Sequence, residues 1–146
     1  MSTHQIQVFI SHSWSHSGHY NKLAQWIFDE RWSIGQASLD FRNFSIPLND
    51  PIHGAPDDKS LAAAIYRHIA RSHVIVIPTG MYAGYSRWIM KELDGADEYK
   101  KPILAINPWG QERKSSVVLK RATDWTGWNK EPLVSKIWNL YKDRYL

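Results

Sequence analysis

Cysteine is absent from this chain of 146 residues. That absence excludes a disulfide framework and a thiolate nucleophile, and it fits a reducing compartment. No stretch approaches the roughly 20 consecutive apolar residues that a membrane-spanning helix needs. The first residues lack the basic segment of a signal peptide and read as the start of a strand. We therefore expect a cytoplasmic protein that does not enter a membrane.

Several nucleotide-binding patterns are also missing. Neither a G-x-G-x-x-G string nor a P-loop string occurs. A receiver domain needs an acidic pair after its first strand and an aspartate after its third, but this chain has Ser11-His12 and Pro78-Thr79 there. A flavodoxin needs a Thr-Gly phosphate loop, which the serine-rich segment 11–18 does not supply. Receiver chemistry is excluded by these residues, and flavin binding is not expected.

The charge is only mildly positive, with a formal net charge of +4 at pH 7. Basic residues are spread along the chain, which indicates a solvated surface and not a nucleic-acid interface. Such a surface would nevertheless favour small anionic molecules such as a dinucleotide.

Short apolar segments alternate with helical patterns along the chain. The segment His73–Pro78 is apolar and β-branched, which is typical of a parallel strand buried on both faces. The alternation predicts an α/β domain over residues 1–146, with a flavodoxin-like central parallel sheet of four to five strands and helices on both faces. The other expected strands are Ile6–Ile10, Gln36–Phe41, Pro102–Ile106 and an edge strand in Ala122–Trp128. The expected helices are Tyr20–Arg31, one capped by Asp57 or Asp58, one capped by Ser86, and Glu131–Leu146.

Ligands of open α/β sheets bind outside the carboxyl ends of the strands. The first predicted strand ends at Ser11, His12, Ser13 and Trp14, and the second ends at Asp40–Arg42. His12, His16 and His19 have a spacing that could suggest a metal site. However, His12 belongs to a strand end and His16 to a helix start, so we expect no metal there.

The segment that begins at Ser86 has a distinctive helical spacing. Trp88 and Glu92 are four residues apart and therefore neighbours on one helix face, beside the core positions Ile89 and Leu93. Spacing alone favours an ordinary interpretation, in which Trp88 packs in the core and Glu92 is solvated or pairs with a neighbouring cation.

The string Ser86-x-Trp88-x-x-x-Glu92-Leu93 resembles the third-helix motif of TIR domains. The opening Val8–Ser13 resembles the first strand of that family, and the segment Asp40–Gly54 resembles its mobile loop. The order of these segments is most similar to the bacterial TIR-like subgroup that includes the ThsB proteins of Thoeris antiphage defence.

The resemblance implies that Glu92 is the catalytic residue of an enzyme that cleaves the nicotinamide–ribose bond of NAD. A single carboxylate can stabilise the cation-like ribose, and nicotinamide leaves without a general acid because it is already cationic. NAD would be the substrate, and no other cofactor is expected. The product would be a cyclic or modified ADP-ribose that signals to a separate effector protein. The candidate substrate-binding residues are Ser11, His12, Ser13, Trp14, Asp40, Arg42, Tyr82, Ser86 and Trp88.

Two alternatives remain open at this point. Many TIR domains are non-catalytic adaptors that self-associate, and a homo-oligomer formed through such contacts is expected in either case. A nucleoside deoxyribosyltransferase would use similar carboxylate chemistry on another glycosidic bond. Nicotinamide release, concentration-dependent assembly and base exchange distinguish the three.

Overall fold

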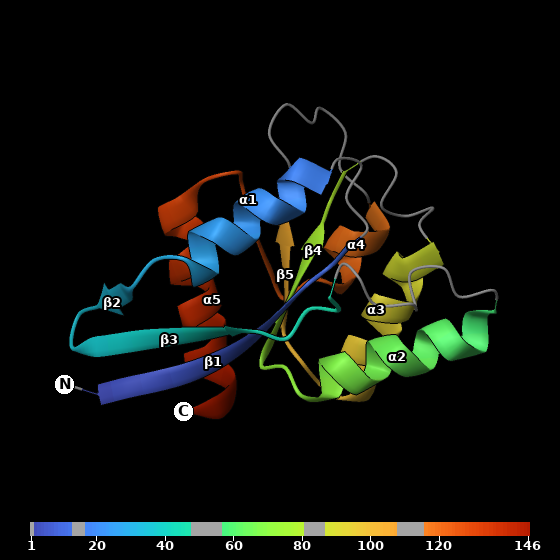
Figure 1. Cartoon of the computed structure of the whole chain (residues 1–146), viewed down its shortest axis with the longest axis horizontal. Helices are drawn as coiled ribbons and strands as arrows, with labels where there is room; N and C mark the ends of the chain where they lie inside the picture. Colours follow the sequence, from blue (N-terminus) through green and yellow to red (C-terminus); the bar gives the residue numbers. More distant parts are fainter. Residues whose placement is uncertain (1, 13–16, 48–56, 81–86, 108–115) are drawn as a thin grey trace.

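The computed structural model of the chain describes residues 2–12, 17–47, 57–80, 87–107 and 116–146. Strands and helices alternate along most of its length (Figure 1). In chain order the elements are β1 (Ser2–Ile10), α1 (Ser17–Phe28), β2 (Trp32–Ile34), β3 (Ala37–Asn43), α2 (Asp58–Ala70), β4 (Val74–Pro78), α3 (Arg87–Glu98), β5 (Ile103–Ile106), α4 (Ser116–Arg121), β6 (Asp124–Thr126) and α5 (Lys130–Tyr145).

The strands form one sheet in the order β2-β3-β1-β4-β5-β6. Every neighbouring pair is parallel except β2 and β3, which are antiparallel. The predicted α/β class with a central, mostly parallel sheet is confirmed, but the sheet has six strands and not four or five. The strand that the sequence did not predict is β2, which is only three residues long and pairs with β3 across a tight turn. Gly35 in that turn has φ +59°, a conformation that glycine adopts without strain.

Two hydrophobic cores lie on opposite faces of the sheet. Figure 1 shows α1 and α5 on one side and α2 and α3 on the other. Strand residues alternate between the two cores: on β4, Val74 and Val76 face α1 and α5, whereas Ile75 and Ile77 face α2 and α3. Because both faces are covered, β4 is apolar at every position, as its sequence predicted.

The helices agree with the sequence predictions in part. Asp57 caps α2, where its side chain accepts a 2.7 Å hydrogen bond from the Ser60 amide, as expected. The first helix begins a turn earlier than predicted, and α4 was not anticipated. Trp125 lies on the edge strand β6 and is 50% exposed.

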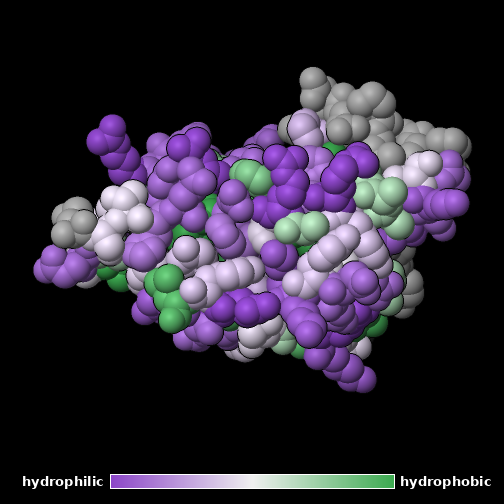
Figure 2. Space-filling view, turned by 90° about the horizontal axis from the view of Figure 1, so that it is seen from below, coloured by the Kyte–Doolittle hydropathy of each residue, from purple (hydrophilic) through white to green (hydrophobic). Residues whose placement is uncertain are grey.

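The face of the molecule seen from below is mostly hydrophilic, and hydrophobic side chains show there only in separate places (Figure 2). No helix among the described residues combines the length and the apolar character that crossing a bilayer requires.

Candidate active site at the carboxyl ends of the strands

The end of β1 sends consecutive side chains to opposite faces of the sheet. Phe9 belongs to the core beneath α2 and α3, and Ser11 follows it by two residues. Ile10 belongs to the core beneath α1 and α5, and His12 follows it by two residues. The Ser11 amide still donates to the Val76 carbonyl at 2.9 Å, which extends the strand pairing past Ile10. The period of two therefore directs Ser11 toward α3 and His12 toward α1.

Ser11 meets Glu92 of α3. The Ser11 hydroxyl donates a hydrogen bond of 2.6 Å to Glu92 Oε1, and both residues are completely buried. The ordinary interpretation of Glu92 as a solvated or locally paired side chain is therefore wrong. Its neighbour Lys91 forms an ion pair with Asp58 of α2 instead, at 3.3 Å.

The environment of Glu92 favours a protonated carboxyl group. Burial raises the pKa of Glu92 to about 8, and the hydrogen bond from Ser11 lowers it only in part. The second oxygen, Oε2, is buried and finds no hydrogen-bond partner among the residues that the structure describes. Buried polar atoms are normally satisfied, so an unpaired carboxyl oxygen at the ligand-binding edge of a sheet indicates a functional group.

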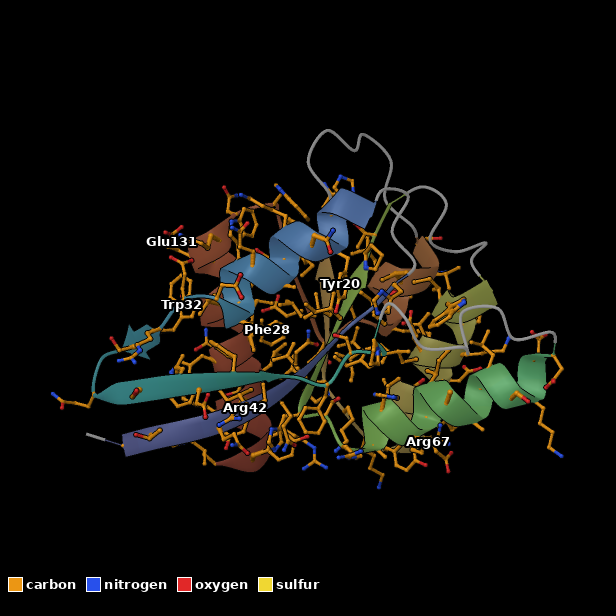
Figure 3. All side chains as sticks on the ribbon, in the orientation of Figure 1. Tyr20, Phe28, Trp32, Arg42, Arg67 and Glu131 are labelled. Atoms are coloured by element: carbon orange, nitrogen blue, oxygen red, sulfur yellow. The ribbon has the colours of Figure 1, made fainter. Side chains whose placement is uncertain are left out.

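Aromatic rings surround His12 on the other side of β1. Its ring stacks on Tyr20 of α1 with 4.3 Å between centroids, and the Trp88 ring approaches it edge-on at 6.3 Å. Tyr20 lies between α1 and the strands (Figure 3). His12 Nε2 donates a hydrogen bond to the Ile46 carbonyl, which places the proton of a neutral ring on Nε2. The half-buried Trp88 and His12 thus join α3 to α1 near the Ser11–Glu92 pair.

Polar residues that the sequence did not single out extend this edge. Thr79, after β4, is buried and donates to Asn107 Oδ1, after β5, at 3.1 Å. Ser45, after β3, is also buried and accepts a 2.8 Å hydrogen bond from the Ile10 amide. Polar residues that directly follow apolar strands are the signal that could have identified them, because parallel strands bring their carboxyl ends together.

Asp40 and Arg42 do not belong to this group. The sequence placed them at a strand end, but β3 continues to Asn43 and pairs Asp40 with Gln5 and Arg42 with Gln7 of β1. Gln5 and Gln7 precede Ser11 by six and four residues, or about 20 and 13 Å along a strand. Figure 3 shows Arg42 on β3, well separated from α3, and its guanidinium forms an exposed 3.0 Å ion pair with Asp40.

Four further candidates, Ser13, Trp14, Tyr82 and Ser86, lie outside the described residues. His16 also lies outside them, and His19 packs against Trp128 with 5.3 Å between ring centroids. Within the described part of the chain, no group of three or more metal-ligating side chains is placed to hold an ion.

The sequence matches a protein family whose model is described as Thoeris protein ThsB, TIR-like domain, over residues 9–113. The matched segment includes Ser11, Glu92 and all the strand ends described above, and it stops before α4. No curated protein is significantly similar to the chain. Because the match covers more than two thirds of the 146 residues, this chain belongs to the ThsB TIR-like family of Thoeris proteins.

Proposed function

We propose that this chain consumes NAD by cleaving the bond between nicotinamide and ribose, with Glu92 as the catalytic residue. The observation that carries the proposal is the Glu92 carboxyl group itself. One of its oxygens is held by Ser11, and the other is buried at the carboxyl edge of the sheet with no hydrogen-bond partner among the described residues. Membership of the ThsB TIR-like family supports the same assignment.

The reaction needs one negative group next to the ribose. The electron pair of the C1′–N bond leaves with nicotinamide, which changes from a cation to a neutral molecule. Positive charge then develops on the ribose, where an ionised Glu92 stabilises it. Water or a hydroxyl group of the ADP-ribose adds to C1′ and loses a proton. No general acid is required, because the leaving group departs uncharged.

The raised pKa of Glu92 fits this use of the carboxylate. Without substrate the group is mostly protonated at neutral pH, since its pKa is about 8. A cationic nicotinamide ring beside it would lower that pKa and favour the ionised form. The negative charge would thus develop when NAD is bound. Because Glu92 has no exposed surface, substrate contact requires a local opening of this edge.

His12 and Trp88 are the described residues best placed to contact the bound dinucleotide. Their rings form an aromatic surface next to the Ser11–Glu92 pair, and such rings stack on the flat groups of nucleotides. Ser11 acts on Glu92 and is a positioning residue. In Thoeris antiphage defence, the product would be a cyclic or modified ADP-ribose that a separate effector protein detects.

The direct test compares wild-type protein and Glu92→Gln during incubation with NAD. We expect nicotinamide release by the wild type and a loss of at least 100-fold in the variant, which keeps nearly the same shape. Equal turnover in both proteins would overturn the assignment of Glu92. Base exchange on deoxynucleosides would instead indicate a transferase, and assembly without turnover would indicate an adaptor.

A further inference from the structure

A cavity lies at the opposite edge of the sheet, near the amino ends of β4 and β5. Its volume is about 400 Å³, which is in the range of small-molecule sites. The lining side chains include Phe44, Arg71, His73, Lys101 and Tyr145. His73 precedes Thr79 by six residues, so about 20 Å of strand separates this cavity from the Glu92 edge. In Figure 1, the last turns of α2 and α5 both lie on this lower side of the sheet.

Positive charge gathers here without matching negative charge. Arg71 and Lys101 line the cavity, and Arg144 borders the adjoining hollow that shares Lys101. None of these three cations forms an ion pair within the described part of the chain, whereas Lys91, Lys130 and Lys136 each do. The described residues that line the cavity include no carboxylate. Asp143 is the acidic residue that lines the adjoining hollow.

Aromatic rings hold these cations in place. The Arg71 guanidinium lies over Phe44 at 5.3 Å from the ring centroid. Lys101 Nζ and the Arg144 guanidinium lie over Tyr145 at 5.9 and 5.5 Å. Contacts with a ring face do not consume N–H donors, so the cations are positioned with donors still available. Arg144 also donates a 3.2 Å hydrogen bond from Nε to the Lys100 carbonyl, which leaves its terminal nitrogens for a ligand. Partial burial and the charge of Arg144 both lower the pKa of Lys101, as expected where like charges crowd together.

His73 adds a neutral hydrogen-bond donor. The Gln7 amide donates a 2.9 Å hydrogen bond to His73 Nδ1, so the ring proton resides on Nε2. Burial, followed by the charge of Lys101, lowers the pKa of His73 and maintains the neutral ring. The Tyr145 ring packs edge-on against the imidazole with 4.8 Å between centroids, and the Tyr145 hydroxyl donates a 3.2 Å hydrogen bond to the His73 backbone carbonyl.

We propose that this cavity binds the phosphate group of a small phosphorylated molecule, through Arg71 and Lys101 with Arg144 in support. Two or three cations that form no ion pair with any described residue match the charge of a phosphate, and a guanidinium fork matches its oxygen geometry. The aromatic rings would border the organic part of the ligand. The site is separate from Glu92, so it does not depend on the function proposed above.

The test is calorimetric titration of the full chain with inorganic phosphate, AMP and adenosine. We expect phosphate and AMP to bind and adenosine not to bind. Arg71→Gln and Lys101→Met should each weaken phosphate binding by at least tenfold, whereas Lys59→Gln, which removes an exposed charge at the start of α2, should not. Glu92→Gln should bind as well as the wild type. Circular dichroism verifies that each variant is folded, and Arg71→Lys should recover part of the affinity because it restores the charge.

Comparing phosphate with AMP identifies the source of the phosphate group. Equal affinity indicates recognition of the free ion, and tighter AMP binding indicates a nucleotide. No binding of either probe by the wild type would overturn the proposal. Binding that both cavity variants leave unchanged would also overturn it.

Discussion

Ser11 and Glu92 lie 81 positions apart in the sequence, yet 2.6 Å separates the serine hydroxyl oxygen from Glu92 Oε1. Strand β1 contributes one partner and helix α3 the other, and both are completely buried. The hydrogen bond stabilises the ionised carboxylate, while burial destabilises it. Burial has the larger effect, so the folded protein retains a proton that an exposed glutamate would release.

The first prediction concerns the pH dependence of folding. An unfolded Glu92 ionises near pH 4.5 and the folded one near pH 8, so between these values only the folded state retains the proton. The stabilising contribution is complete below pH 4.5 and is lost as pH rises toward about 8, by at most about 1.4 kcal/mol per pH unit. Glu92→Gln removes this slope. Urea unfolding of both proteins at pH 5, 6, 7 and 8 should show the variant gaining stability relative to the wild type.

Subtracting the two proteins cancels the contributions of all other titrating groups, including His73, whose pKa is lowered. A difference in unfolding free energy that stays constant from pH 5 to pH 8 would show that Glu92 has an ordinary pKa in the folded state.

The second prediction concerns Ser11. Ser11→Ala removes the hydrogen bond that opposes burial, so the pKa of Glu92 should rise further. If the ionised carboxylate carries the reaction, the acidic limb of the kcat/KM profile for NAD moves to higher pH. The lost buried hydrogen bond should also cost about 1 kcal/mol of folding stability.

Ser45→Ala is a matched control for Ser11→Ala. Ser45 is a buried serine at the same edge, but it accepts from the Ile10 amide and does not contact Glu92. It should lower stability by a similar amount and leave the pH profile in place. A shift of the profile in both variants would mean that Ser11 acts through folding alone.

The third prediction concerns Asp40 and Arg42. Their ion pair is exposed, and Arg42 and Asp40 lie about 13 and 20 Å of strand away from Ser11. Arg42→Ala should therefore change nicotinamide release by less than twofold and stability by less than about 1 kcal/mol. A large loss of turnover in Arg42→Ala, measured in the same assay as Glu92→Gln, would show that the end of β3 contributes to the substrate site.

The fourth prediction concerns the contact between α2 and α3 that positions Glu92. A Cβ atom on Gly95 would come within 3.1 Å of both Ile69 and Tyr66 of α2, whereas one on Gly18 in α1 would meet nothing within 4 Å. Gly18→Ala should be neutral or stabilise by about 0.5–1 kcal/mol. Gly95→Ala gains the same helix propensity but crowds the core, so it should be less stable than Gly18→Ala by about 1 kcal/mol or more. Thermal unfolding compares the two, and equal melting temperatures would contradict the close packing.

The sequence predicted the interior of the sheet well and its margins less well. The segment His73–Pro78 was recognisable because burial on both faces makes every position apolar. The strand β2 was not, since three residues are too few to establish a period. Asp40 and Arg42 were misplaced because polar residues also occur inside β3, which is close to the edge of the sheet and exposed in part.

The burial of Glu92 could not be predicted from helical spacing. Helical spacing placed it at the edge of a core stripe but could not distinguish a buried carboxyl group from a solvated one, because that depends on Ser11 from a distant strand. The resemblance of residues 86–93 to a TIR motif favoured the functional interpretation. The alternation along β1 could have directed Ser11 and His12 to opposite faces once the end of the strand was known.

The short strands at the two margins of the sheet restrict how copies of this protein can join. β2 and β6 are the outermost strands, and each is only three residues long. Short edge strands offer few free backbone groups, which is a common protection against the joining of one sheet to another. Extension of the sheet into a second copy through β2 or β6 is therefore disfavoured. Strand β1 leaves a longer edge open, because its pairing with β4 begins only at Val8.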